Sequence, residues 1–176
     1  IQLHGLEVGG YPILGGTEYL NDLKESAWVV CAMGAAVTRK KIVSEIKKKR
    51  NIKFATLIAP DVMCSDRVVI GAGSIICSGT IITVAIQIGE HVIVNLDCTI
   101  GHDARIQDFV TIYPSVNVSG CVVVEEGAEL GTGTQIIQGK RIGEETIVGA
   151  GAVVVKDLPA KCTAVGSPAQ PIKYRE

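Results

Sequence analysis

Large aromatic side chains are scarce in this sequence, which limits how its core can be built. Aromatic residues make up 4% of the 176 residues, with one Trp, two Phe and four Tyr. The core must therefore consist mainly of smaller aliphatic side chains. Excess positive charge is lacking too, because the net charge is −1 at pH 7 and the pI is near 6.4. We accordingly predict neither nucleic acid nor a membrane surface as a partner.

Long hydrophobic segments and paired cysteines are also lacking. The longest uncharged run in the N-terminal third, residues 26–38, is shorter than the roughly 20 apolar residues that span a bilayer. No charged-then-apolar stretch typical of a signal peptide opens the chain. The cysteines form no C-x-x-C pair and do not cluster with histidine: Cys31, Cys64, Cys77, Cys98, Cys121 and Cys162. We expect a cytoplasmic protein with reduced thiols and no metal.

Branched aliphatic residues recur at every sixth position through most of the chain. Sixteen of seventeen such positions are Ile, Val or Leu: Ile58, Cys64, Ile70, Ile76, Ile82, Ile88, Val94, Ile100, Ile106, Ile112, Val118, Val124, Leu130, Ile136, Ile142, Val148 and Val154. A second column of small or branched residues follows four positions later, from Val62 to Thr134. A period of six fits neither a single long strand nor a helix.

A hexapeptide period is typical of a parallel β-helix. Each hexad forms one flat side, and three sides complete a triangular coil of about 18 residues. Successive coils stack about 4.8 Å apart, the spacing of paired strands. The narrow core has no room for large rings, which explains the scarcity of aromatic residues. Equal six-residue sides resemble the left-handed β-helix family, and we adopt that handedness from the resemblance.

Residues 1–57 lack the hexads and predict a small α/β unit. Residues 28–33 form an apolar run that predicts a buried strand. Residues 38–50 interleave apolar with basic side chains and predict an amphipathic helix whose basic side chains, from Arg39 to Arg50, form a solvated face, with phosphate binding as the alternative. Residues 53–58 predict a second strand. The order strand, helix, strand indicates a βαβ unit.

The start of this unit is predicted to be a loop, residues 1–11, with His4 exposed. Its glycine pairs do not form the G-x-G-x-x-G pattern of a phosphate-binding turn. We therefore expect the unit to be incomplete, with about one further βα unit preceding Ile1. The expected division is a partial α/β substrate-binding domain (1–57), a β-helix (58–157) and a proline-containing C-terminal cap or strap (158–176).

Only one of the three histidines stands out as a candidate for chemistry. His91 lies within a hexad next to Glu90 and is predicted to be a solvated surface residue. His102 follows Gly101 at a coil bend and precedes Asp103. A histidine accepts a proton near neutral pH, and an adjacent carboxylate can hold its tautomer and raise its basicity.

The chain resembles the left-handed β-helix (hexapeptide-repeat) acyltransferases, most closely the sialic-acid O-acetyltransferases and UDP-4-amino-sugar N-acetyltransferases. The matching segments are AMG with TRKKI (32–42), GHD around His102 with Asn95 seven residues before it, DFVTIYPSVNVSG (108–120), GAGAVV (149–154) and VGSPA (165–169). The resemblance implies acetyl-CoA as co-substrate, a sugar or nucleotide-sugar acceptor, and a homotrimer.

Site residues follow from this resemblance by position. His102 is the implied general base, and Asp103 is the acid that increases its basicity. Asn95 and Gly34 are the implied substrate-binding residues, with Gly34 as a glycine that merely ends a strand as the alternative. No covalent acyl-enzyme is required, so Cys98 is expected to point into the core.

Cofactor contacts are likewise implied at Thr111, Thr132, Ala150 and Gly166. Thr111 stands where several relatives have a second histidine, which leaves the positioning of the acyl group open. Tight coil geometry alone is the other explanation for the small residues among these.

Three other functions are compatible with this fold. A metal-dependent hydratase needs three histidines that converge across a subunit boundary, whereas the coils contain only His91 and His102. A non-catalytic β-helix subunit would make the His102–Asp103 pair incidental. A hexapeptide acetyltransferase could instead use a non-sugar acceptor such as serine. The sequence leaves the acceptor, and amide versus ester formation, open.

Overall fold

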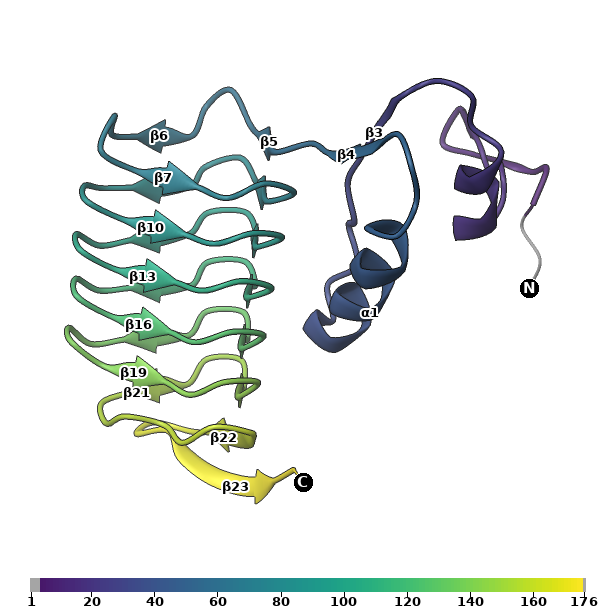
Figure 1. The fold of residues 1–176 in the computed structure, drawn as a ribbon. Helices are drawn as coiled ribbons and strands as arrows, with labels where there is room; N and C mark the ends of the chain where they lie inside the picture. The colour runs from purple at the N-terminus through teal and green to yellow at the C-terminus, as the bar shows by residue number, and fades with distance from the viewer. Residues whose placement is uncertain (1–3, 176) are drawn as a thin grey trace.

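The dominant feature of the structure, a computed structural model that describes residues 4–175, is a triangular solenoid of stacked coils (Figure 1). Seventeen two-residue strands build it, and each ends on one of the predicted hexad positions. They are β5 (Leu57–Ile58), β6 (Met63–Cys64), β7 (Val69–Ile70), β8 (Ile75–Ile76), β9 (Ile81–Ile82), β10 (Gln87–Ile88), β11 (Ile93–Val94), β12 (Thr99–Ile100), β13 (Arg105–Ile106), β14 (Thr111–Ile112), β15 (Asn117–Val118), β16 (Val123–Val124), β17 (Glu129–Leu130), β18 (Gln135–Ile136), β19 (Arg141–Ile142), β20 (Ile147–Val148) and β21 (Val153–Val154).

Strands of successive coils pair in parallel with a constant offset, as in Ile88 opposite Ile106 and Val94 opposite Ile112. This register confirms the predicted 18-residue coil. Side 1 contains β5, β8, β11, β14, β17 and β20; side 2 contains β6, β9, β12, β15, β18 and β21; side 3 contains β7, β10, β13, β16 and β19. The bends between consecutive sides form three corners, named corner 1–2, corner 2–3 and corner 3–1.

The interior is filled by the two aliphatic columns, as predicted. From Ile76 to Val154 every residue of the first column is buried, and the second column is buried from Ser74 to Thr134. Cys98 has no exposed surface, which confirms that it points into the core. Ile58 remains half exposed, because the first coil pairs with a neighbouring coil on one side only.

The βαβ order predicted for the N-terminal unit is confirmed. Strands β3 (Ala27–Val29) and β4 (Ile52–Phe54) pair in parallel, and α1 (Ala36–Ile46) lies between them in the chain. The prediction of a buried strand was wrong for Trp28, which is 67% exposed with Lys53 Nζ 5.5 Å from its ring centroid. A two-stranded sheet has too little cover to bury both faces.

The opening segment contains more structure than the predicted loop. Strands β1 (Glu7–Val8) and β2 (Tyr11–Pro12) form an antiparallel hairpin, followed by a 3₁₀ helix, η1 (Thr17–Asn21). Gly9 and Gly10 form the hairpin turn, both at positive φ, which is a signal for a two-residue turn. Residues 1–3 of the predicted loop lie outside the described residues.

Helix α1 lies beside the solenoid (Figure 1), and Arg39 anchors it there. The prediction of a solvated basic face was wrong for Arg39, whose side chain is fully buried, although Lys40, Lys41 and Arg50 are exposed. Six hydrogen bonds of 2.5–3.2 Å join its guanidinium to the carbonyl oxygens of Met33, Gly34, His91, Phe109 and Val110 and to Thr111 Oγ1. All its nitrogens are thereby satisfied, as burial of a cation requires, so Arg39 is not available to bind a phosphate.

The first turn of α1 makes a second contact with side 1. The backbone N–H of Ala36 donates to Glu129 Oε1 at 2.9 Å, and the carboxylate also complements the positive end of the helix dipole. Lys40 and Lys47 form exposed ion pairs with Glu126 and Glu90 near corner 3–1. The N-terminal unit is therefore held against side 1 and corner 3–1.

His91 is buried beneath this unit, so the prediction of a solvated histidine was wrong. Its side chain is 1% exposed, with the Phe54 ring edge-on at 4.6 Å and the Phe109 ring stacked at 5.2 Å. Within residues 4–175, neither ring nitrogen has a hydrogen-bond partner.

Burial is the main cause that lowers the pKa of His91. Lys47 and Arg39 lower the pKa further, whereas Glu90 and Asp108 oppose them. The ring is therefore held in its neutral form.

The segment after the last coil folds back onto it. Strand β22 (Cys162–Val165) pairs in parallel with β20, and β23 (Gln170–Tyr174) pairs antiparallel with β22. Leu158, Cys162 and Ala164 are buried at this end, as a capping segment requires. None of the helices described between residues 4 and 175 has the length and hydrophobicity needed to cross a bilayer.

Candidate active site

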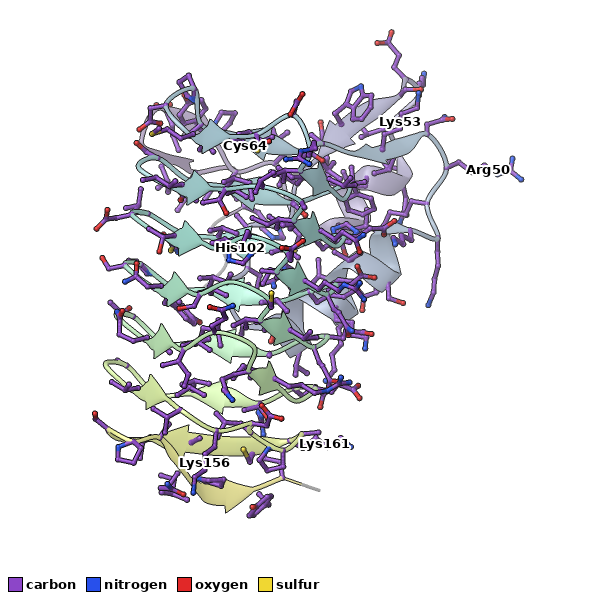
Figure 2. All side chains as sticks on the ribbon, turned by 90° about the vertical axis from the view of Figure 1, so that its left-hand side faces the viewer. Arg50, Lys53, Cys64, His102, Lys156 and Lys161 are labelled. Atoms are coloured by element: carbon purple, nitrogen blue, oxygen red, sulfur yellow. The ribbon has the colours of Figure 1, made fainter. Side chains whose placement is uncertain are left out.

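His102 and Asp103 form a hydrogen-bonded pair at corner 2–3, in the bend between β12 and β13. His102 Nδ1 lies 2.9 Å from Asp103 Oδ2, and half of the His102 side chain (51%) is exposed. Figure 2 shows His102 midway along the solenoid, away from Arg50 and Lys53 of the N-terminal unit. An ionised carboxylate only accepts hydrogen bonds, so this pairing assigns the proton of the neutral ring to Nδ1 and leaves the lone pair on Nε2.

Gly120 lies under the His102 ring in the next coil. A Cβ atom at Gly120 would lie 2.5 Å from His102 Nε2, closer than atoms can approach. The position following His102 by one coil therefore has to be glycine if the ring is to keep this orientation. The spacing is a signal for this, because Gly120 lies 18 residues, or one coil, after His102.

A shallow groove of about 360 Å³ runs along side 2 to the same corner. Gly101 and Gly120 line its end, and Thr83, Thr99 and Asn117 line its floor. Thr99 Oγ1 is 2.5 Å from Asn117 Oδ1, so the polar groups of the floor are linked between coils. The lining of the groove thus includes the residue directly before His102 and the glycine under the His102 ring.

Tyr113, which follows β14 at corner 1–2, neighbours both predicted substrate-binding residues. Asn95 and Tyr113 occupy the same position in successive coils, directly after the paired strands β11 and β14. Gly34 approaches from the N-terminal unit, where a Cβ would lie 3.6 Å from Tyr113 Oη. Tyr113 donates to Glu129 Oε2 at 3.3 Å, and burial, followed by Glu129, raises the pKa of its hydroxyl.

Thr111, a predicted cofactor contact, forms hydrogen bonds within the chain. Its side chain is fully buried, and Oγ1 donates to the carbonyl of Gly34 at 2.7 Å while accepting from Arg39 at 2.9 Å. The hydroxyl joins the carbonyl of Gly34 to β14. A cofactor contact of Thr111 stays a prediction.

The other predicted cofactor residues are exposed and lie along corner 1–2. Thr132 and Ala150 occupy the same bend in successive coils, where the N–H of Gly151 donates to the Thr132 carbonyl at 2.8 Å. Gly166 follows β22, and its carbonyl accepts from Val153 at 3.0 Å. The three positions follow one another along corner 1–2, where mainly backbone atoms are available for contact.

The predicted residues thus fall into two groups within one chain. His102 and Asp103 occupy corner 2–3, whereas Asn95, Thr132 and Ala150 occupy corner 1–2, with the whole of side 2 between them. His91 at corner 3–1 is enclosed by Phe54 and Phe109, so it is not available as a ligand beside His102 in a hydratase site. Sequence reasoning missed Arg39, Tyr113 and Gly120, of which Tyr113 and Gly120 lie in the motif of residues 108–120.

Comparisons with known proteins agree with this architecture. No family model matches the sequence. GDP-perosamine N-acetyltransferase from Escherichia coli O157:H7 is 32% identical over 180 residues, which cover 97% of this chain and 79% of that protein.

Two solved structures superpose along nearly the whole chain. A variant of perosamine N-acetyltransferase from Caulobacter crescentus, in complex with CoA and GDP-perosamine, has a TM-score of 0.91 and 32% identity. The match covers 94% of this chain and 80% of that one. The acetyltransferase domain of PglB from Neisseria gonorrhoeae FA1090, in complex with acetyl coenzyme A, has a TM-score of 0.89 and 32% identity, covering 96% and 82%.

The chain belongs to the hexapeptide-repeat, left-handed β-helix acetyltransferases, and its neighbours within that family are amino-sugar N-acetyltransferases. It is an acetyltransferase, as the resemblance predicted. The predicted fold class, a left-handed β-helix preceded by a small α/β unit, is likewise confirmed.

Proposed function

We propose that this protein transfers the acetyl group of acetyl-CoA to the amino group of a nucleotide-linked sugar, with His102 as the general base. The observation that carries the assignment of the base is the 2.9 Å pairing of His102 Nδ1 with Asp103 Oδ2 at a half-exposed coil bend. This pairing leaves the lone pair on Nε2, which lies over Gly120 at the half-exposed corner and is available to accept a proton.

The chemistry requires one proton acceptor and no covalent enzyme intermediate. His102 Nε2 takes a proton from the attacking amine as its nitrogen bonds to the thioester carbonyl carbon. The C–S bond then breaks, and the thiolate of CoA leaves and takes the proton from the imidazolium. Asp103 stabilises the imidazolium in between, and a hydrogen-bond donor must meet the oxyanion.

The acceptor is an amino-sugar nucleotide, with Gly34 and Asn95 as its binding residues. Support comes from the relatives, which include proteins named for GDP-perosamine, and from the joint approach of Gly34 and Asn95 to Tyr113. The relatives named for a sugar acceptor are N-acetyltransferases, so amide formation is proposed over ester formation. Thr132, Ala150 and Gly166 are the proposed cofactor contacts, mainly through their backbone.

A homotrimer completes the site. The base occupies corner 2–3 and the proposed acceptor and cofactor residues occupy corner 1–2, so a second copy must bring the two corners together. Native mass spectrometry should give three chains per particle, and a monomer that retains turnover would contradict this arrangement. We assign the protein to the cytoplasm, in keeping with acetyl-CoA as co-substrate and with its pattern of cysteines.

Acceptor-dependent release of CoA tests the proposal. Purified protein is given acetyl-CoA with GDP-, UDP- or dTDP-linked amino sugars, and the acetylated product is identified by mass spectrometry. Free serine, a sialic acid and the corresponding non-amino sugar nucleotides serve as matched controls. We expect turnover only with an amino-sugar nucleotide, and equal or greater turnover with serine would contradict the proposal.

Acetyl-CoA binding is measured separately. A ligand that binds only the folded chain raises the melting temperature, so acetyl-CoA should stabilise the protein with no acceptor present. Stabilisation without turnover on any acceptor would support a binding module instead of an enzyme.

A further inference from the structure

Cys121 lies beside the His102–Asp103 pair, and nothing in the proposed reaction uses it. A ring nitrogen of His102, a carboxylate oxygen of Asp103 and Cys121 Sγ all lie within 4.8 Å of one another. All three side chains are exposed, so solvent and solutes reach them directly.

The repeat explains why residues so far apart in sequence meet here. Asp103 and Cys121 occupy the same bend position in successive coils, and both have φ near 58°. Their side chains therefore leave corner 2–3 in the same direction, one coil apart. The N–H of Cys121 also donates to the carbonyl of His102 at 2.7 Å, which fixes the two bends relative to each other.

The ring of His102 points toward the next coil and not away from it. Its Nε2 lies over Gly120, the residue directly before Cys121. Imidazole, carboxylate and thiol thus converge on one point outside the corner.

We propose that His102, Asp103 and Cys121 form a binding site for a zinc-like divalent cation, whose occupation inhibits the enzyme. Thiolate and imidazole select zinc over magnesium or calcium, and three protein ligands with an open fourth position suit a tetrahedral ion. Ligand atoms on one zinc ion are roughly 3–4 Å apart, which small rotations of these exposed side chains achieve from the present separation. Binding releases the thiol proton of Cys121 to solvent.

Inhibition follows from the ligands themselves and rests on the proposed role of His102. An imidazole that coordinates the metal ion cannot accept the proton of the attacking amine. Asp103 is also withdrawn from its pairing with His102. Metal binding and acetyl transfer are then mutually exclusive at corner 2–3.

Cobalt(II) substitution tests the site without reference to activity. Wild-type protein should take up one equivalent of Co²⁺ with a thiolate-to-cobalt charge-transfer band. The band should be lost in Cys121→Ser, which preserves shape but removes the soft ligand, and retained in Cys64→Ser, a matched change of another exposed cysteine. Absence of the band in wild type, or its persistence in Cys121→Ser, would overturn the proposal.

Zinc titration of turnover tests inhibition, with the acetylated sugar measured by mass spectrometry so that free thiols do not interfere. We expect zinc to inhibit wild type and Cys64→Ser reversibly, with recovery on chelation. In Cys121→Ser the inhibitory concentration should rise by roughly tenfold or more, since loss of even an outer partner costs tenfold or more in affinity. Equal inhibition of wild type and Cys121→Ser would contradict the proposal.

The two proposals fail separately. If His102→Ala keeps its turnover but loses the cobalt band, the base assignment is wrong and the metal site stands. If His102→Ala loses turnover but keeps the cobalt band, the base assignment stands and the metal site is wrong.

Discussion

His91 and His102 both occupy bends of the same solenoid, yet their surroundings give them opposite properties. His91 at corner 3–1 is enclosed by Phe54 and Phe109, and its ring nitrogens are unpartnered within the described residues. His102 at corner 2–3 is half exposed and paired with Asp103. What covers a corner therefore decides whether a histidine there stabilises the fold or is available for chemistry.

Replacing each histidine in turn should give the largest effect. His102→Ala should lower turnover by roughly 100- to 10,000-fold, the usual contribution of a general base. His91→Phe should leave turnover nearly unchanged, because the next coil already has Phe109 at the same bend position with φ 58°. Steady-state kinetics with melting temperatures of both variants measure this.

Similar behaviour of the two variants would contradict this difference between the corners. Retained turnover in folded His102→Ala would remove its role as base, and an inactive, fully folded His91→Phe would place chemistry at the covered corner. Acetyl-CoA stabilisation should persist in both variants.

Arg39 holds the cover on corner 3–1, and its loss should give the next largest effect. Arg39→Met leaves several buried carbonyl oxygens without a donor, which should lower the free energy of unfolding by about 2–3 kcal/mol. Urea unfolding and proteolysis within α1 measure this loss. Lys40→Met on the same helix is the control, since its exposed ion pair with Glu126 contributes about 1 kcal/mol or less. Equal loss in both variants would contradict the anchoring role of Arg39.

A methyl group under His102 should have a smaller effect on activity. Gly120→Ala must displace the His102 ring, because the new Cβ would lie 2.5 Å from Nε2. A shift of this kind should lower turnover by roughly 10- to 100-fold with little change in melting temperature.

A double-mutant cycle shows whether this effect passes through His102. In a His102→Ala background the same glycine substitution should cause almost no further loss. A full additional loss there would mean that Gly120 acts by another route.

The smallest effect should be a pH dependence of stability at the covered corner. The pKa of His91 is lowered in the folded state, mainly by burial. Below about pH 6.5 the unfolded chain therefore binds more protons at this residue than the folded chain does. The stabilisation is complete above that pH and decreases as the pH falls toward the lowered pKa. The melting temperature should therefore decrease as the pH falls. His91→Phe should remove the contribution of His91 to this decrease, whereas the control His4→Gln should leave it in place. An unchanged pH profile in His91→Phe would contradict neutral burial.

The solenoid could be predicted from the sequence because its period alone decides which side chains enter the core. Every strand from β5 to β21 ends on the predicted column. The cover of His91 could not be predicted, because it depends on the docking of α1 through the buried Arg39. The helical pattern of residues 38–50 places this arginine among the solvated basic residues. Phe109, 18 residues after His91, was the one available signal of a covered corner.

The candidate site was predicted only in part. The pairing of His102 with Asp103 follows from their adjacency at a bend. Asn95 lies seven residues before His102, about one side of the triangle, so the two cannot share a corner of one chain. Counting residues in units of six shows that His102 and Asn95 lie at different corners, which is the basis for the proposed site between copies.

The ring state of both histidines in one ¹⁵N-histidine NMR titration tests the central comparison most directly. We predict that neutral His102 carries its proton on Nδ1 and leaves Nε2 bare, and that His91 stays neutral to lower pH than a free histidine. A neutral His102 with its proton on Nε2, or a His91 that becomes charged as readily as a free histidine, would contradict the account.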